Sequence, residues 1–360
     1  MIIDLIAGAR PNFVKIASLI HAIQQDNASI EFRLIHTGQH YDKNLSESFF
    51  DQLQIPDPDK NLGVGSGTQA QQTANIMMRY EALLNENKPD LCVVVGDVTS
   101  SMACAISASK LGVKVAHVEA GIRSNDKSMP EEINRILIDS ISDYYFTTSR
   151  NASGLLLKQG VSKENIFFVG NTMIDTLLKF QPKFRKPIIW KDMALSKNEY
   201  FVLTLHRPSN VDDPVKLKKL LELLNECARN LPVIFPAHPR IKKFLKEQNI
   251  CLDNFKFTEP ISYLEFNFLV ANAKCVITDS GGITEETTVL NIPCITIREN
   301  TERPETVEIG TNVIVGTEEK KIRKAISTVF TNDWKTGQIP ELWDGKSGER
   351  IIKILKDFNL

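Results

Sequence analysis

Three acidic residues in the first half of the sequence stand where a carboxylate could take up or release a proton. Asp97 and Glu119 each follow a short, very apolar run, and Glu131 opens a stretch with helical periodicity. Burial next to an apolar strand can raise the pKa of a carboxyl group, which makes proton transfer feasible near neutral pH. The spacing leaves another interpretation open, because Asp97 and Glu119 could cap a turn or helix, and acids are common in a first helical turn.

A glycine-containing segment in the second half has the features of an anion-binding site. The segment Asp279-Ser-Gly-Gly-Ile-Thr-Glu-Glu286 follows an apolar run and leads into a helical pattern, so Ser280, Gly281 and Gly282 would form the first turn of a helix. The free N–H groups of such a turn suit a phosphate. Helix capping is the alternative, but two consecutive glycines destabilise a helix, so capping alone explains them poorly.

Three cationic residues could help to hold the same anion. Arg10 and Lys15 fall near the start of a predicted helix at residues 11–25, where a positive charge is unfavourable unless an anion lies close by. Arg303, in Thr301-Glu-Arg-Pro304, could bind a diphosphate through the planar fork of its guanidinium. Solvated helix charges and a surface ion pair are the respective alternatives.

Polar side chains recur directly after other predicted strands in both halves of the chain. In open parallel sheets, ligands bind beyond the carboxyl ends of the strands. We therefore expect these residues to face a cleft between two domains, with a substrate bridging it. They are Arg10, His36, Gln39, His40, Asp97, Glu119, His206, Arg207, His238, Asp279, Ser280 and Arg298.

The elements that must position these residues alternate between strand and helix along the chain. This alternation predicts parallel sheets covered on both faces, and hence an α/β fold with two doubly wound, Rossmann-like domains. Helical patterns such as residues 11–25, 68–85, 131–142, 214–229, 263–273 and 281–290 lie between the strands. The predicted strands are residues 2–7, 31–37, 91–96, 114–118, 144–148, 166–169, 201–205, 232–236, 255–258, 275–278, 293–297 and 312–315.

The same pattern suggests where the domains begin and end. The first domain, with the acidic candidates, is expected at residues 1–180, and the second, with the nucleotide-binding candidates, at residues 190–345. A polar stretch around residues 181–198 separates them. A last helix within residues 346–360 could pack back on the first domain.

Composition narrows the class of protein. The 360 residues include 43 Lys and Arg against 44 Asp and Glu, a formal net charge of −1, which argues against a binder of nucleic acid or of acidic membranes. No apolar stretch approaches the roughly 20 residues that span a bilayer. The six cysteines show no close pairing, which is typical of reduced thiols in a cytoplasmic protein. No clustered metal-ligand motif appears, so we predict no catalytic metal.

Together these motifs resemble the non-hydrolysing UDP-N-acetylglucosamine 2-epimerases of bacteria and archaea. The resemblance implies the two-domain GT-B fold, no need for a metal or nicotinamide, and a homodimer. It also implies interconversion of UDP-N-acetylglucosamine and UDP-N-acetylmannosamine, or of close diacetamido or uronic analogues, commonly for surface polysaccharide synthesis. The matching segments are Gly8-Ala-Arg-Pro11 with Lys15, Thr37-Gly-Gln-His40, Gly96-Asp97, His117-Val-Glu-Ala-Gly-Ile-Arg123, Pro130-Glu-Glu-Ile-Asn-Arg135, His206-Arg207, Asp279-Ser-Gly-Gly-Ile-Thr-Glu-Glu286 and Thr301-Glu-Arg-Pro-Glu305.

The resemblance also implies a mechanism and roles for single residues. The family is thought to eliminate UDP, keep the resulting 2-acetamidoglucal bound, and add UDP back after inversion at C2. By this pattern Asp97, Glu119 and Glu131 are the acid–base candidates, and His206 is catalytic or lies near the phosphates. The residues that would hold the nucleotide, with Glu286 on the ribose hydroxyls, are Arg10, Lys15, Ser280, Gly281, Gly282, Glu286 and Arg303.

Other functions use similar residues. A GT-B glycosyltransferase would use the same nucleotide cleft with an added acceptor site, and a non-catalytic nucleotide-sugar sensor would bind UDP without turnover. A hydrolysing relative would release free N-acetylmannosamine. The three carboxylates favour the epimerase. The chain reads His206-Arg-Pro-Ser-Asn210 where many members continue His-Arg-Arg-Glu-Asn, which weakens any transfer of the substrate activation attributed to some bacterial members.

Overall fold

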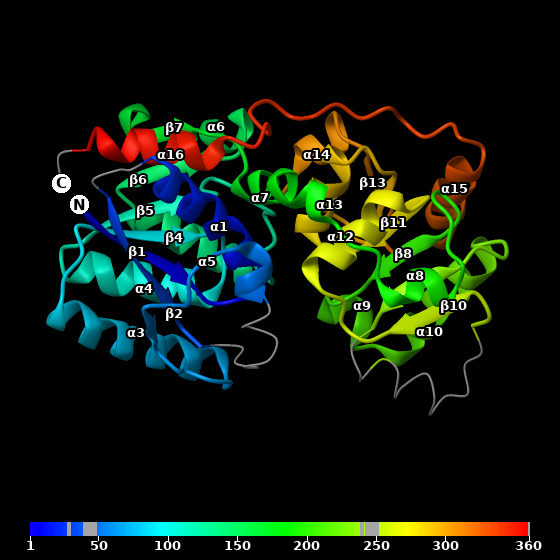
Figure 1. The fold of residues 1–360 in the computed structure, drawn as a ribbon, viewed down its shortest axis with the longest axis horizontal. Coiled ribbons are helices and arrows are strands. Elements are labelled where there is room, and N and C mark those ends of the chain that lie inside the picture. Colours follow the sequence, from blue (N-terminus) through cyan, green and yellow to red (C-terminus); the bar gives the residue numbers. More distant parts are fainter. Residues whose placement is uncertain (27–29, 39–48, 238–240, 242–251, 359–360) are drawn as a thin grey trace. The chain divides into compact units, whose positions relative to one another are not determined.

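The computed structural model describes residues 1–26, 30–38, 49–237, 241 and 252–358. The chain forms two units, each built around its own parallel sheet (Figure 1). Unit 1 comprises Met1–Lys179 and Glu341–Leu360, and unit 2 comprises Phe180–Pro340. The predicted α/β fold with two doubly wound domains is confirmed.

Unit 1 contains a seven-stranded sheet in the order β3-β2-β1-β4-β5-β6-β7, with every neighbouring pair parallel. The chain starts in the middle with β1, builds outwards to β3, and then crosses to the other side of β1 to form β4. At such a reversal, ligands bind beyond the carboxyl ends of the strands. The strands are β1 (Ile2–Ala7), β2 (Glu31–His36), β3 (Lys60–Asn61), β4 (Leu91–Val95), β5 (Lys114–Val118), β6 (Tyr144–Thr147) and β7 (Ile166–Phe168).

The helices of unit 1 cover both faces of this sheet (Figure 1). All five residues of β4 are buried, as a central parallel strand between two helical layers requires. Helix α3 shows how the sequence starts such an element, because Thr68 and Gln71 accept each other's backbone N–H groups in a capping box. The helices that lie wholly within the described residues are α1 (Arg10–Gln25), α3 (Gln69–Glu86), α4 (Thr99–Lys110), α5 (Pro130–Ile141), α6 (Arg150–Lys158), η1 (Lys163–Asn165), α7 (Thr172–Phe180) and α16 (Ser347–Lys356).

The end of the chain belongs to unit 1, where α16 packs against α1 (Figure 1). The buried Asp175 carboxylate joins the two helices, since it accepts a hydrogen bond from Ser18 Oγ at 2.6 Å and from Gly348 N–H at 2.7 Å. The indole of Trp343, which is buried, donates to the carbonyl of Thr148 at 3.0 Å. These bonds secure the last segment to the first part of the chain.

Unit 2 repeats the plan with a six-stranded parallel sheet in the order β10-β9-β8-β11-β12-β13. Its strands β8 and β11 are neighbours at the point where the strand order reverses, as β1 and β4 are in unit 1. Apolar residues of the strands pack with α10 and α15 in a buried core. The strands are β8 (Phe201–Thr204), β9 (Val233–Pro236), β10 (Phe255–Thr258), β11 (Cys275–Thr278), β12 (Cys294–Thr296) and β13 (Asn312–Ile314).

The helices of unit 2 include short pieces that the sequence pattern did not predict. The 3-10 helix η2 (Gln181–Lys183) and α8 (Ile188–Asp192) fall in the stretch expected to be a polar connection, and they are too short to show a clear helical period. In unit 1, the strand β3 was also not predicted, because it consists of two exposed polar residues. The other helices that lie wholly within the described residues of unit 2 are α9 (Pro208–Val211), α10 (Pro214–Cys227), α12 (Tyr263–Asn272), α13 (Gly281–Val289), α14 (Pro304–Glu308) and α15 (Glu319–Phe330).

The described residues contain neither a membrane-spanning helix nor a metal-binding cluster. None of their helices combines the length and apolarity needed to cross a bilayer. Within the same residues, no group of three or more His, Cys, Asp or Glu side chains is arranged to hold a metal ion.

Candidate active site

Asp97 and Glu119 follow neighbouring strands of unit 1, β4 and β5, and the Glu119 carboxylate lies close to Gly96, the residue before Asp97. Gly96 has a positive φ of 66°, and a Cβ there would lie 3.1 Å from both Glu119 Oε2 and Lys15 Nζ. Glycine therefore lets the Glu119 carboxylate approach the backbone at the end of β4.

Glu119 is held in an unusual conformation with a buried cation beside it. Its φ is +75°, a conformation that non-glycine residues rarely adopt, and its N–H donates to Phe146 O at 2.9 Å. The Lys15 ammonium, on α1, forms an ion pair with Glu119 Oε2, and both side chains are buried. The structure thus places Lys15 against an acid candidate, a contact that the expected phosphate role did not anticipate.

Asp97 is paired with a cation from α5. Both Nε and Nη2 of Arg135 donate to Asp97 Oδ2, at 2.9 and 2.6 Å, and Asn134 Nδ2 donates to the Asp97 carbonyl at 2.8 Å. The Asp97 side chain is 23% exposed while that of Arg135 is only 4% exposed, so the carboxylate is the part that solvent can reach.

The two adjacent acids at the start of α5 have different surroundings. Glu131 is exposed on the first turn. Glu132 is buried and accepts hydrogen bonds from Ser124 N–H at 2.9 Å, Asn125 N–H at 3.0 Å and Arg135 Nη1 at 2.7 Å. Burial alone would raise the pKa of Glu132, but these hydrogen bonds outweigh burial and lower the pKa. Of this pair, Glu132 shapes the loop and Glu131 is open to solvent.

In unit 2, the carboxylate of Asp279 at the end of β11 holds the segment that follows β8. It accepts from His206 N–H, from Arg207 N–H at 3.0 Å and from Asn210 Nδ2 at 3.0 Å, and Nδ1 of His206 lies 2.8 Å from Oδ1. Burial acts to raise the pKa of Asp279, but the hydrogen bonds from His206 and its neighbours lower it overall. The imidazole of His206 is 61% exposed while Asp279 is fully buried, so Asp279 orients a histidine that faces solvent.

The predicted phosphate-binding turn forms at the start of α13. Ser280 is the N-cap residue, and Gly281 and Gly282 are the first two helical residues. A Cβ at Gly281 would lie 2.7 Å from Glu302 Oε1, so glycine allows Glu302 to approach. Glu302 in turn accepts from Arg298 Nη2 at 2.5 Å and lies 3.7 Å from Arg207 Nη2. Two guanidinium groups therefore lie near this helix N-terminus.

Arg303 and Glu286 are both buried. Nε of Arg303 donates to Glu285 Oε1 at 2.6 Å, an internal ion pair in place of the surface pair considered from sequence. Burial and the neighbouring Glu285 charge raise the pKa of Glu286 to about 8. Glu286 is therefore protonated near neutral pH, and its carboxyl group can donate a hydrogen bond.

The other described candidates, Arg10 and His36, both lie in unit 1. Arg10 is exposed at the start of α1, and its guanidinium lies 6.0 Å from the Phe49 ring centroid. His36 accepts the Gly38 N–H through Nδ1 at 3.0 Å and is buried. Three other residues expected at strand ends lie outside the described residues: Gln39, His40 and His238.

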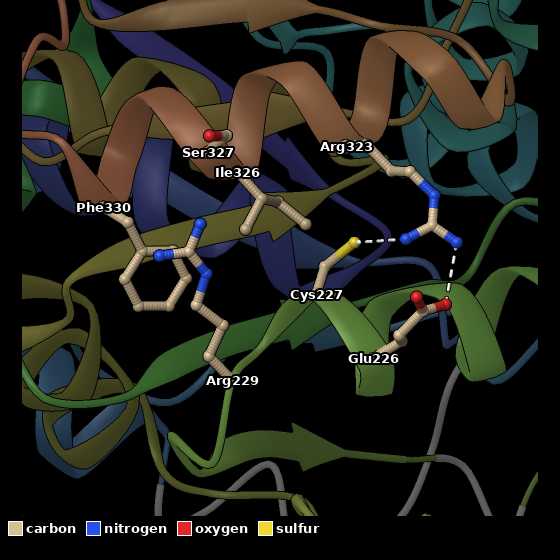
Figure 2. A pocket seen from close by; sticks show the side chains of 7 residues that line it. All are labelled: Glu226, Cys227, Arg229, Arg323, Ile326, Ser327 and Phe330. Atoms are coloured by element: carbon tan, nitrogen blue, oxygen red, sulfur yellow. Dashed lines mark hydrogen bonds and ion pairs between the residues drawn. The ribbon is translucent and has the colours of Figure 1, made fainter.

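A pocket of about 230 Å³ in unit 2 lies between α10 and α15 (Figure 2). Its wall contains the ion pair of Arg323 with Glu226 at 2.7 Å, and Arg323 Nη1 lies 3.8 Å from Cys227 Sγ. Arg229, also in the wall, lies shortly before β9 in the chain, so this wall belongs to the amino-terminal edge of the sheet. None of the predicted site residues lines this pocket.

The chain is similar over its whole length to known epimerases of nucleotide sugars. A family model described as UDP-N-acetylglucosamine 2-epimerase matches residues 21–356. The UDP-N-acetylglucosamine 2-epimerase of Methanocaldococcus jannaschii is 43% identical over 367 residues, covering 99% of each chain. The UDP-2,3-diacetamido-2,3-dideoxy-D-glucuronate 2-epimerase of Pseudomonas aeruginosa is 41% identical over 315 residues, covering 86% of this chain and 87% of the other.

Solved structures similar to this chain are also epimerases of nucleotide sugars. The crystal structure of the M. jannaschii UDP-GlcNAc 2-epimerase in complex with UDP-GlcNAc and UDP matches with a TM-score of 0.88 and 42% identity, covering 99% of both chains. The Rickettsia bellii UDP-N-acetylglucosamine 2-epimerase matches with a TM-score of 0.89 and 31% identity, covering 99% of this chain and 96% of the other. These neighbours have the GT-B type of fold, so the predicted fold class and family are confirmed. The chain belongs to the UDP-N-acetylglucosamine 2-epimerase family.

Proposed function

We propose that the protein is a non-hydrolysing 2-epimerase that interconverts UDP-N-acetylglucosamine and UDP-N-acetylmannosamine. The observation that carries this proposal is the pair of acids that follow the neighbouring strands β4 and β5, Asp97 and Glu119, each of which has a cation of its own. Inversion at C2 needs one group to remove a proton and another to return it on the opposite face. Two carboxylates that follow neighbouring strands are suited to that exchange.

The reaction proceeds by elimination, because the C2 hydrogen of the sugar is not next to a carbonyl group. A carboxylate takes the C2 proton, the C–H electrons form the C1=C2 double bond, and the C1–O bond breaks with its electron pair leaving on UDP. In the return step an acid protonates C2 from the other face while a diphosphate oxygen of UDP attacks C1. Asp97, Glu119 and Glu131 are our candidates for these proton transfers.

The departing diphosphate needs donors and positive charge, and unit 2 offers both at the start of α13. The N–H groups of the turn that contains Ser280, Gly281 and Gly282 suit phosphate oxygens. His206 follows β8, the strand next to β11, which the turn follows. Its imidazole is oriented by Asp279 and open to solvent, so it can stabilise developing charge on the leaving group. The other groups proposed to hold the nucleotide are Arg10, Lys15 and Arg303, with Glu286 on the ribose hydroxyls.

A second substrate class is favoured by the relatives. The P. aeruginosa relative, whose name specifies UDP-2,3-diacetamido-2,3-dideoxy-D-glucuronate, is nearly as similar to this chain as the M. jannaschii enzyme. We therefore include diacetamido and uronic UDP sugars as candidate substrates of the same elimination and re-addition.

Incubation of the purified protein with each UDP sugar in turn, followed by NMR of the products, tests the function. We expect UDP-N-acetylmannosamine to appear from UDP-N-acetylglucosamine, or the corresponding manno epimer from the diacetamido uronate. Absence of an epimer from every substrate contradicts the proposal. Binding of UDP with no turnover would instead indicate a sensor, sugar transfer to an acceptor a glycosyltransferase, and free N-acetylmannosamine a hydrolysing enzyme.

Three broader proposals rest on the family alone. We propose that the protein acts in the cytoplasm, that it forms a homodimer, and that its product supplies surface polysaccharide synthesis. Light scattering on the purified chain tests the second, because one chain has a mass of 40.5 kDa. A measured mass near that of a single chain across the working concentration range would contradict a stable dimer.

A further inference from the structure

We infer that Asp139 is a positioning residue for the epimerase reaction, because it fixes the backbone on both sides of Glu119 and, through His117, the turn that carries Asp97. The inference rests on the proposed function. Asp139 lies on α5 and is buried, and it enters no hydrogen bond with Glu119 or Asp97 that the structure records. Its action on the two acids is therefore indirect.

The two oxygens of Asp139 bind residues placed symmetrically about Glu119. Oδ1 lies 2.6 Å from His117 Nδ1, and Oδ2 accepts the Gly121 N–H at 3.1 Å. His117 precedes Glu119 by two residues and Gly121 follows it by two residues. One carboxylate thus holds both ends of a five-residue segment whose central side chain is an acid candidate.

His117 extends the same contact to the neighbouring strand. Its Nε2 lies 3.0 Å from the carbonyl oxygen of Gly96, the residue directly before Asp97. The Gly96 N–H also donates to Val118 O at 2.9 Å, so the end of β4 is bonded to the end of β5 twice. The chain Asp139–His117–Gly96 therefore joins α5, β5 and the turn that carries Asp97.

We call Asp139, with its bonds to His117 and Gly121, the clamp. Residues 117–121 need the clamp because their backbone includes sparsely populated conformations. Glu119 has φ +75° and Gly121 has φ +78°, and a non-glycine residue in this region persists only where its surroundings hold it there. Arg123 Nη1 lies 2.6 Å from Asp139 Oδ2. Burial favours the neutral form of Asp139, but His117 and Arg123 lower its pKa overall, so the clamp is an anion.

Substitution of Asp139 tests the inference. Asp139→Ala should lower kcat about 100-fold, the loss typical of a misplacement of roughly 1 Å, while KM and the Kd for UDP change less than threefold. Asp139→Asn should restore most of this loss, because Asn Oδ1 can accept from Gly121 and Nδ2 can donate to an unprotonated His117 Nδ1. His117→Phe removes the bond to Gly96 while Asp139 keeps Arg123 as a partner, so it serves as a second variant if Asp139→Ala does not fold.

Asp143→Ala is the matched control. Asp143 accepts the Val115 N–H at 2.9 Å and pairs with Lys114, which places it near the opposite end of β5. This variant should keep kcat within twofold. The inference is overturned if folded Asp139→Ala and His117→Phe both retain kcat within threefold of the wild type, or if KM rises as much as kcat falls.

Amide hydrogen exchange of Gly121 in the full chain separates this inference from the proposed function. Exchange should be much faster in Asp139→Ala than in the wild type and unchanged in Asp143→Ala. Unchanged exchange in Asp139→Ala contradicts the clamp whatever the activity. Faster exchange in a protein whose wild type shows no epimerisation contradicts the proposed function while leaving the clamp in place.

Discussion

The carboxyl edges of the two sheets each pair a carboxylate with a nitrogen-containing side chain, but the exposed member of the pair differs. In unit 1, Asp97 is 23% exposed and its partner Arg135 is 4% exposed. In unit 2, His206 is 61% exposed and its partner Asp279 is fully buried. Unit 1 therefore presents a carboxylate supported by a buried guanidinium, and unit 2 presents an imidazole supported by a buried carboxylate.

This reversal matches the two tasks of the proposed reaction. Proton transfer at C2 needs a carboxylate that the sugar can reach, whereas a diphosphate needs donors and positive charge. Since both units share one topology, the difference in chemistry comes from the side chains at the strand ends. A doubly wound fold supplies the position, and the choice of partner supplies the function.

Removal of the acids in unit 1 should have the largest effect. We expect Asp97→Asn, Glu119→Gln and Glu131→Gln each to lower kcat by about 10²–10⁴, the usual loss for a fixed acid or base, while UDP binding is spared. Steady-state kinetics and UDP titration measure the two properties. Asp143→Asn, at the other end of β5, is the control with unchanged turnover. Wild-type kcat in all three acid variants would remove the assigned roles.

The buried glutamates Glu132 and Glu286 extend the comparison to stability. The pKa of Glu286 is raised to about 8, above its ordinary value of 4.5. Between pH 4.5 and 8, the native state therefore keeps a proton on Glu286 that the unfolded chain has released. Its contribution to stability is complete below pH 4.5 and is lost as pH rises through 8. Between pH 6 and 8 this loss amounts to about 2 kcal/mol.

Urea unfolding at pH 6, 7 and 8 measures that slope. Glu286→Gln should flatten it, because the amide is neutral throughout. Glu132→Gln should lower stability without changing the slope, since the pKa of Glu132 is lowered and its contribution is lost only as pH falls below its ordinary range. An equal slope in wild type and Glu286→Gln would show that Glu286 is ionised across this window.

A smaller effect is expected from the glycine at the start of α13. In Gly281→Ala the new Cβ would meet Glu302 Oε1 at 2.7 Å, so Glu302 must shift and release Arg298. We expect UDP affinity to fall about tenfold, equivalent to about 1.4 kcal/mol. Gly154, on α6, has nothing within 4 Å of a Cβ position, and Gly154→Ala should leave UDP affinity unchanged. Equal affinities in the two variants would separate this turn from nucleotide binding.

Much of the fold follows from local sequence. The run at β4 is apolar at every position and that at β5 is mostly apolar, and glycines and acids come directly after both, so both the parallel sheets and the edge that carries Asp97 and Glu119 were predictable. Strand β3 was not, because Lys60-Asn61 has no apolar pattern and is defined only by its pairing with β2.

The partners of the site residues were harder to predict than the residues themselves. Lys15 and Glu119 are 104 positions apart, and Arg135 lies 38 positions from Asp97. Such pairs depend on how strands and helices are placed in space, which periodicity does not reveal. Arg135 ends the motif Pro130-Glu-Glu-Ile-Asn-Arg135, but a charged residue on a helix is usually solvated. No feature of the neighbouring sequence indicated that Arg135 is buried.

Incorporation of solvent deuterium at C2 tests most directly whether the acids of unit 1 transfer the proton. In D2O, the wild type with UDP-N-acetylglucosamine should place deuterium at C2 of the epimerised sugar, and Glu119→Gln should lose this exchange while binding UDP as tightly as before. An epimer that keeps its original hydrogen at C2, or undiminished exchange in Asp97→Asn, Glu119→Gln and Glu131→Gln alike, would contradict proton transfer by the acids of unit 1.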